Sequence, residues 1–164
     1  MPNQSATLSA PDTCLALHAG TARELMTPNP LSIHDTATAQ DAADFLYTHH
    51  ISGAPVIDVA GRPVGVITMT DLVWFQRAKD GHFPTQHEIY YRDAPAKTRP
   101  VSASARLARE LMTPAVFSVR PETPVRQVLE EMYRSKVHRL FVVDGDGTLI
   151  GVVAAFDVIR DLCE

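Results

Sequence analysis

A seven-residue run that occurs twice constrains the fold of this chain more than any other feature. Ala22–Pro28 reads Ala-Arg-Glu-Leu-Met-Thr-Pro, and the same seven residues return at Ala108–Pro114. Carried forward without gaps at this offset of 86 residues, Ala22–Val73 matches Ala108–Ile159 at 15 of 52 positions. Because internal self-similarity at a fixed offset is the signature of a repeated structural unit, the chain is predicted to contain two copies of one fold.

Both copies have the same predicted order of elements. A short apolar strand comes first, and a helix follows whose apolar residues recur at i, i+3, i+4 and i+7, with N-caps predicted at Thr38 and Thr123. Two apolar strands joined by a glycine-containing turn come next, and a last helix begins near Asp71 and Asp157. The pattern predicts an α+β fold of two β-α-β-β-α units. A unit of about sixty residues is marginal alone, so the copies are expected to pack together with pseudo-twofold symmetry.

This packing predicts burial of one set of apolar strand residues, namely Val56, Ile57, Val66, Ile67, Val142, Val143, Val152 and Val153. Residues 1–21 are predicted to be a flexible N-terminal segment and residues 22–79 the first repeat. Residues 80–107 form a long connector and residues 108–163 the second repeat. Connectors of this length are usually functional or disordered.

Composition bears on the partners of the chain. Fifteen Lys and Arg residues against nineteen Asp and Glu residues give a net charge of -4, which disfavours nucleic acid as the main ligand. The longest apolar run, Leu149–Phe156, is far shorter than the roughly 20 residues of a membrane span. The first residues do not resemble an export signal, so we expect a cytoplasmic protein with two free cysteines and no membrane partner.

The most informative motif is Gly65–Asp71, in which Thr68 ends a strand and Asp71 opens a helix. A hydroxyl and a carboxylate at this position can hold the vicinal diol of a sugar beside the free N–H groups of the helix end. The same two residues can equally be an ordinary helix cap and a carboxylate that complements the helix dipole. The spacing alone leaves both interpretations open.

The second copy keeps the carboxylate but changes its surroundings. Asp157 is retained, whereas Ala154 stands where the first copy has its threonine. His138 and Arg139 precede the middle strand at the place of Ser52 and Gly53. An arginine there suits the bidentate binding of phosphate, although arginine at a strand entry is also common on solvated surfaces.

Taken in order, these motifs resemble a tandem pair of cystathionine β-synthase (CBS) domains, the Bateman module. The resemblance rests on the Leu-Met-Thr-Pro openings, on Pro55-Val56-Ile57-Asp58 and on the Gly-x-x-Thr-x-x-Asp pattern, and it covers most of residues 22–79 and 108–163. It implies clefts that bind adenosine-containing ligands such as AMP, ADP or ATP. It also implies the site residues, which are Thr68, Asp71, Ser52, Gly53, Ala54, Pro55, His138, Arg139 and Asp157.

In this resemblance the helix aspartate holds the ribose hydroxyls and the His-Arg pair contacts phosphate. The first site keeps both Thr68 and Asp71 and is expected to be the working one, since Ala154 and Phe141 depart from the pattern in the second. The expected function is regulatory: an adenine nucleotide binds and changes the shape of the module, and an unidentified effector protein recognises that change. We also expect a homodimer, because the apolar residues Leu72–Phe75 are more than one small repeat can easily bury.

Three alternatives remain: a ligand-free dimerisation scaffold, a pair that binds S-adenosylmethionine or NAD, and an enzyme. Catalysis would need a convergent nucleophile, base or metal set, and the sequence offers none that we recognise. We therefore expect no enzyme activity, no catalytic residue, no metal and no obligatory cofactor.

Overall fold

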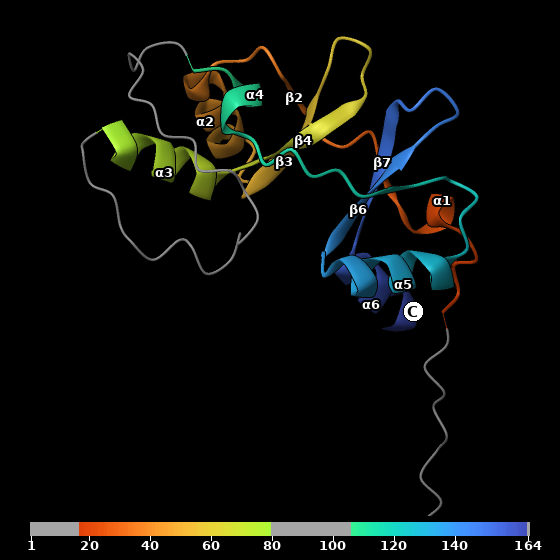
Figure 1. Ribbon diagram of the computed structural model, residues 1–164. Coiled ribbons are helices and arrows are strands. Elements are labelled where there is room, and N and C mark those ends of the chain that lie inside the picture. The colour runs from red at the N-terminus through yellow and green to blue at the C-terminus, as the bar shows by residue number, and fades with distance from the viewer. Residues whose placement is uncertain (1–16, 80–105, 164) are drawn as a thin grey trace, which may run out of the picture.

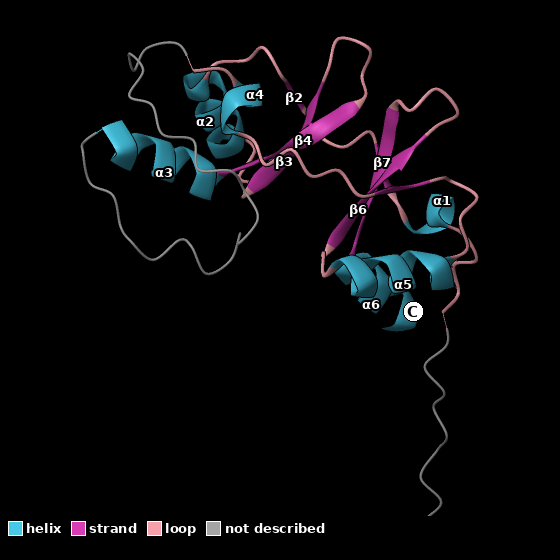
Figure 2. Cartoon of the chain, in the orientation of Figure 1, coloured by secondary structure: helices cyan, strands magenta, loops and turns pink. Residues whose placement is uncertain are grey.

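The computed structural model describes residues 17–79 and 106–163, and Figure 2 shows their helices and strands. In chain order the elements are α1 (Ala22–Leu25), β1 (Thr27–Pro28), β2 (Ile33–His34), α2 (Ala39–Thr48), β3 (Gly53–Ile57), β4 (Pro63–Thr68), α3 (Met69–Lys79), α4 (Ala108–Leu111), β5 (Ser118–Val119), α5 (Val125–Ser135), β6 (Arg139–Val143), β7 (Leu149–Ala154) and α6 (Ala155–Cys163). The predicted connector lies almost entirely outside the described residues, as does most of the predicted N-terminal segment.

Two sheets repeat one topology. In the first, β2 runs parallel to β3, which pairs antiparallel with β4; in the second, β5 runs parallel to β6, which pairs antiparallel with β7. Each hairpin turns at a glycine with positive φ, Gly61 at 75° and Gly147 at 85°, a backbone region that favours glycine. The predicted pair of β-α-β-β-α units is confirmed, although the leading strands β2 and β5 are only two residues long.

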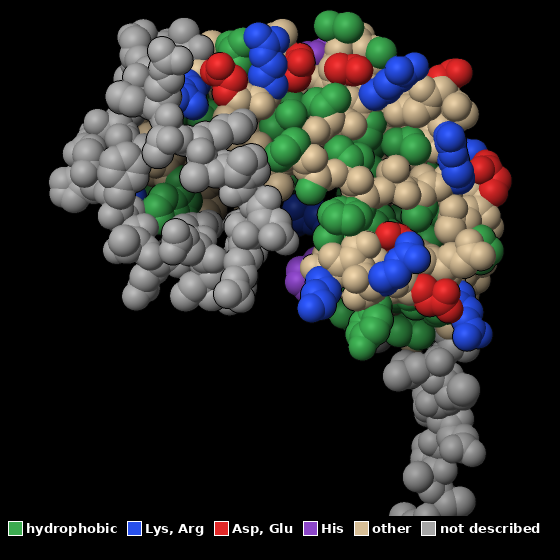
Figure 3. All heavy atoms as spheres, in the orientation of Figure 1, with side chains coloured by type: hydrophobic (Ala, Val, Ile, Leu, Met, Phe, Trp, Pro, Cys, Tyr) green, Lys and Arg blue, Asp and Glu red, His purple; other side chains and the backbone are tan. Residues whose placement is uncertain are grey.

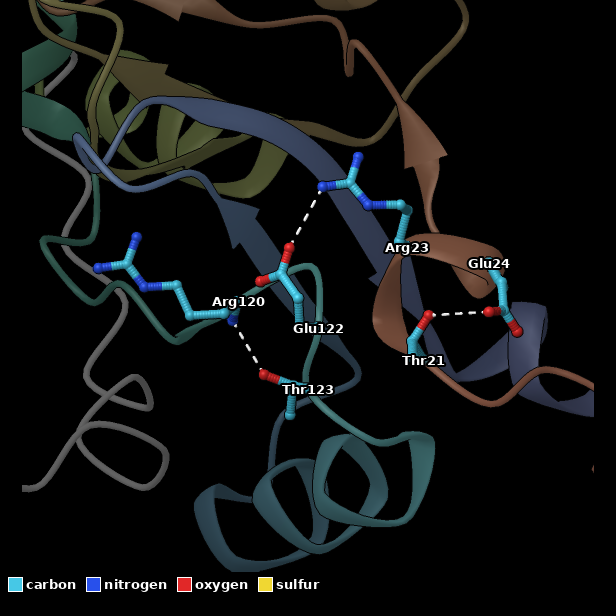
Figure 4. A network of polar contacts seen from close by, with 6 residues as sticks. All are labelled: Thr21, Arg23, Glu24, Arg120, Glu122 and Thr123. Atoms are coloured by element: carbon cyan, nitrogen blue, oxygen red, sulfur yellow. Dashed lines mark hydrogen bonds and ion pairs between the residues drawn. The ribbon is translucent and has the colours of Figure 1, made fainter.

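The two long central helices begin differently. α2 starts with the predicted cap: the Thr38 hydroxyl accepts a hydrogen bond from the Asp41 N–H (3.1 Å), and the Asp41 carboxylate accepts one from the Thr38 N–H (3.0 Å). The Thr38 hydroxyl also donates to that carboxylate, and this hydrogen bond is the main reason why the pKa of Asp41 is lowered. For α5 the prediction is wrong by one residue, because Pro124 holds the N-cap position and Thr123 instead accepts from the Arg120 N–H (Figure 4).

Burial alternates along β4 and β7 but is continuous along the middle of β3 and along most of β6. Five of the eight strand residues predicted to be buried are so, namely Val56, Ile67, Val142, Val143 and Val153. The prediction is wrong for Ile57, Val66 and Val152, which are half-buried. In β4 and β7 successive residues point to opposite faces, so Ile67 enters the core beneath the helices and its neighbour Val66 does not. In β6 the neighbours Val142 and Val143 are both buried, so this central strand is covered on both faces.

The opening segment of the first repeat packs on the second repeat. Ala22 and Leu25 of α1 lie in one core cluster with Val128 and Leu140. β1 then adds a strand to the second sheet, where Thr27 pairs with Val152. Figure 1 shows α1 beside β7, α5 and α6, all of which lie about a hundred or more residues after it in the chain.

The opening segment of the second repeat makes the reciprocal contact. Ala108 of α4 lies in the core cluster of Leu46, Val56 and Ile67, and Figure 1 shows α4 beside α2. Thr113 pairs with Val66 through two backbone hydrogen bonds of 2.9 and 3.0 Å. We call the unit of β2, α2, β3, β4, α3 and α4 the first lobe, and the unit of α1, β1, β5, α5, β6, β7 and α6 the second lobe. Each lobe therefore contains parts of both repeats.

The two exchanges are related by the same offset of 86 residues as the sequence repeat. The Ala22 N–H donates to the Thr123 carbonyl (2.8 Å), and the Ala108 N–H donates to the Ala37 carbonyl (2.7 Å). Figure 4 shows the first of these junctions from close by, where Arg23 also forms an ion pair with Glu122 (3.3 Å). The predicted pseudo-twofold symmetry is thus confirmed.

Close packing at two glycines supports the exchange. A Cβ atom added at Gly65 would lie 2.6 Å from the Met112 sulfur and 2.7 Å from the Thr113 carbonyl oxygen, and one at Gly151 would lie 2.3 Å from the Met26 sulfur. The hairpin turns also meet, since the Leu149 N–H donates to the Gly61 carbonyl (3.0 Å). Figure 3 shows hydrophobic side chains gathered over the middle of the molecule, where the lobes join.

Candidate functional site

The junction of β4 and α3 holds the strongest candidate residues. Thr68 ends β4, and Asp71 lies in the first turn of α3. The Asp71 Oδ2 atom accepts hydrogen bonds from the Thr68 N–H (2.8 Å) and the Thr68 hydroxyl (2.7 Å). The helix-cap interpretation is therefore correct. It uses one carboxylate oxygen only: within the described part of the chain, Asp71 Oδ1 makes no hydrogen bond, and the residue is half-buried.

The start of β3 lies directly beside this junction. Gly53 pairs with Thr68 across the ladder, and the Ser52 carbonyl accepts from the Met69 N–H (3.0 Å). A Cβ atom at Gly53 would lie 3.0 Å from the Thr68 Cγ2 atom, so the absence of a side chain permits the close approach. The structure thus brings Ser52, Gly53, Thr68 and Asp71 together.

Two further predicted site residues continue along β3. Ala54 pairs with Ile67 and is 2% exposed within the core cluster of the first lobe. Pro55 pairs with Val66 and is buried. Neither side chain carries a polar group, so both can shape a site but cannot hydrogen-bond a ligand through their side chains.

The junction of β7 and α6 is the equivalent place in the second lobe. Asp157 Oδ2 accepts from the Ala154 N–H (2.8 Å), and the Ala155 N–H donates to the His138 carbonyl (2.9 Å). Arg139 pairs with Ala154 across the ladder, and the His138 and Arg139 side chains are exposed. The structure therefore also brings these predicted residues together, at the second junction.

Besides Ala154 in place of Thr68 and His138-Arg139 in place of Ser52-Gly53, three further differences separate the second junction from the first. Asp157 is 8% exposed, whereas Asp71 is half-buried. The second carboxylate oxygen of Asp157, Oδ1, lies 3.4 Å from the Arg160 guanidinium. The first junction has no equivalent ion pair, because position 74, which corresponds to Arg160, is tryptophan. Phe141, buried opposite Val152, replaces the proline of the first copy.

A cavity of about 380 Å³ adjoins the second junction. It is lined by Glu24, Leu25, Asp157, Arg160 and Asp161. The three carboxylates in this lining already accept backbone hydrogen bonds: Glu24 from Gly20 (2.7 Å), Asp161 from His18 (2.8 Å) and Asp157 from Ala154 (2.8 Å). Each carboxylate of the lining therefore already has at least one oxygen hydrogen-bonded to a backbone N–H group of the protein.

Sequence reasoning predicted Asp157 but missed the rest of this lining. Glu24 and Leu25 come from the other repeat, and only the exchange of opening segments brings them here. Arg160 lies three residues after Asp157 on the same helix, a spacing that could have identified the pair.

In residues 17–79 and 106–163, no group of three or more His, Cys, Asp or Glu side chains is arranged to hold a metal ion. In the same ranges, every helix is too short or too polar to cross a bilayer.

Comparison with curated proteins finds relatives at low but extended identity. CBSX1, a chloroplastic CBS domain-containing protein of Arabidopsis thaliana, is 28% identical over 134 residues, which are 78% of this chain and 57% of that protein. The gamma-3 subunit of the 5'-AMP-activated protein kinase of Bos taurus is 29% identical over 129 residues, which are 78% of this chain and 23% of that subunit. The chain thus spans about half of the one relative and a quarter of the other.

Solved structures agree with the fold. The crystal structure of CBSX2 in complex with AMP matches with a TM-score of 0.64 and 26% identity, covering 87% of this chain and 95% of that one. The CBS domain of a bacterial CNNM/CorC family Mg²⁺ transporter in complex with ATP matches with a TM-score of 0.63 and 26% identity, covering 88% and 87%. The family model for the CBS domain matches residues 22–77 and again residues 108–164, so this chain belongs to the CBS domain family and contains two CBS domains.

Proposed function

We propose that this chain is a regulatory module that binds an adenosine-containing nucleotide of the AMP, ADP or ATP class at the junction of β4 and α3, and that it acts by binding rather than catalysis. Thr68 and Asp71 hold the ribose, with Ser52 and Gly53 beside them. Ligand binding changes the shape or association of the module, and an effector protein reads that change.

The half-buried carboxylate of Asp71 carries this proposal. One of its oxygens is fixed by Thr68, so the other is held in a defined direction and is left as an acceptor. A vicinal diol can donate to such an oxygen, and hydrogen bonds to a charged acceptor are about twice as strong as neutral ones. The AMP bound to CBSX2 and the ATP bound to the transporter domain support an adenosine-containing ligand over other sugars.

A ligand-free scaffold is the second candidate, and one observation favours it for the second lobe. There the hydroxyl is absent, and both oxygens of Asp157 already have partners. The same lobe presents the exposed side chains of His138 and Arg139, which support a contact with phosphate. S-adenosylmethionine and NAD contain the same ribose and adenine, so both are included with the nucleotides in the binding test below.

A thermal-shift panel tests the proposal directly. The full chain is heated alone and with AMP, ADP, ATP, S-adenosylmethionine, NAD and, as a control, GMP. Because a ligand that binds only the folded state stabilises it by mass action, at least one adenosine-containing ligand is expected to raise the melting temperature in a concentration-dependent way. If none does so at millimolar concentration, the proposed function is wrong and the scaffold is favoured.

We also expect a homodimer. Leu72 is buried and Trp74 and Phe75 are half-buried, so the apolar surface predicted around them is mostly covered. The last helices instead expose Val73 (53%) on α3 and Phe156 (71%) and Ile159 (54%) on α6. Val73 and Ile159 are related by the repeat offset, and apolar faces of this kind favour symmetric association.

Light scattering coupled to size-exclusion chromatography should therefore give a mass twice that of one chain, which is 18.0 kDa. Changing Phe156 and Ile159 to serine should return it to the monomer mass, whereas Tyr133→Ser, at an 88% exposed position on α5, should leave the dimer intact. A wild-type monomer at high micromolar concentration would contradict the expectation.

A further inference from the structure

The two aspartates of the candidate sites use their oxygens differently, and two residues of the second lobe, Ala154 and Arg160, cause the difference. In the first lobe, Asp71 Oδ2 has two donors, the N–H and the hydroxyl of Thr68. In the second lobe, Ala154 supplies only its N–H to Asp157 Oδ2. The Arg160 guanidinium lies 3.4 Å from the other oxygen, Oδ1.

We propose that Arg160 is a specificity-determining residue of the second site: by pairing with Asp157 Oδ1 it occupies the oxygen that would otherwise accept a ribose diol. The inference rests on the proposed function, in which the equivalent oxygen of Asp71 binds ligand. It extends that function by naming the side chain that makes the two sites unequal.

Burial makes this ion pair more effective than one on the open surface. The Asp157 side chain is 12% exposed, so few water molecules compete with the guanidinium for Oδ1, whereas the Arg160 side chain is 56% exposed and can move away. Both groups line the cavity of about 380 Å³ beside the second junction, so a ligand group that entered there would meet the pair.

The neighbouring charges favour a cation at position 160. Glu24 and Asp161 line the same cavity, which makes its charge negative even with the guanidinium counted. A neutral adenosine offers Arg160 no anionic group in exchange for Asp157. The second site is therefore expected to bind a neutral ribose weakly as long as residue 160 is positively charged.

The test isolates the second site by using Asp71→Asn as the background and adenosine, which has no phosphate, as the probe. Calorimetry of the full chain should show adenosine affinity rising by up to about fivefold when Arg160→Gln is added, the range expected for loss of a partly exposed ion pair. Ala154→Thr together with Arg160→Gln should give at least the same gain, because the hydroxyl then fixes Oδ2 as Thr68 does in the first lobe.

Two control variants separate charge from disturbance of the lobe. Arg160→Lys keeps the charge and should give no gain. Arg126→Gln removes an arginine of the same lobe that is paired with Glu130 (3.1 Å) on α5, and it should also leave adenosine affinity unchanged. An unchanged or weaker adenosine affinity after Arg160→Gln is added to the Asp71→Asn background would overturn the inference, because Arg160 would then not withhold Asp157. If the wild-type chain binds none of adenosine, AMP, ADP and ATP, the proposed function itself fails.

Discussion

Asp71→Asn is expected to weaken the binding of the preferred adenine nucleotide by about one to two decades. The substitution keeps the size of the side chain and one acceptor oxygen for the cap, but it removes the charge that strengthens one or two hydrogen bonds to the ribose. Hydrogen bonds to charged groups are worth about 1.5–3 kcal/mol each, and about 1.4 kcal/mol corresponds to one decade. Titration calorimetry of both chains with the ligand identified by the thermal-shift panel measures the loss.

Asp157→Asn is the matched control, since it makes the same change at the equivalent position of the second lobe. Its effect should be smaller, because both oxygens of Asp157 already have partners within the protein. If Asp157→Asn abolishes binding while Asp71→Asn leaves it intact, the working site has been placed in the wrong lobe.

The second large effect is expected from Leu25→Ala, which should destabilise the second lobe. The rest of the repeat to which Leu25 belongs lies in the first lobe. Leu25 is 3% exposed and packs with Val128, Leu140 and Val153 of the second lobe. Truncating a buried leucine to alanine leaves a cavity and typically costs about 2–5 kcal/mol. Urea unfolding of the variant should show this loss in the free energy of unfolding.

Hydrogen exchange shows where the loss falls. Amide protection should decrease in α5, β6 and β7 more than in α2, β3 and β4, because α1 packs in the core of the second lobe. Leu31→Ala, at a 47% exposed position of the same repeat, should change stability by less than about 0.5 kcal/mol. Protection lost mainly in β3 and β4 after Leu25→Ala would contradict the exchanged packing.

Local features of the fold could be predicted because their causes are local in the sequence. The helical spacing of Ala42 and Leu46 indicated the buried face of α2, and the glycine-containing turns indicated both hairpins. Thr38 and Asp41 form the predicted reciprocal cap. The repeat itself required only a comparison of the chain with itself, and the family follows from motifs that stand in the same order in both copies.

Part of the candidate site was predictable for the same reason. Thr68 and Asp71 are three residues apart at a strand-to-helix junction, so their contact follows from the helix cap alone. The approach of Ser52 and Gly53 follows from the hairpin of β3 and β4, whose register brings Gly53 opposite Thr68. The half-burial of Val66 and Val152 was not predicted, because the hydropathy of a residue does not say which face of a strand is covered.

The sequence by itself determined that there are two copies, what elements each contains and where the carboxylates lie along the chain. Only the tertiary structure decided which copy each opening segment packs against. Identical runs such as Ala22–Pro28 and Ala108–Pro114 have the same intrinsic preferences, so nothing local distinguishes packing on their own repeat from packing on the other one. The difference lies in contacts between residues about a hundred positions apart, such as the hydrogen bond from Ala22 to Thr123, and these form only when both lobes are assembled.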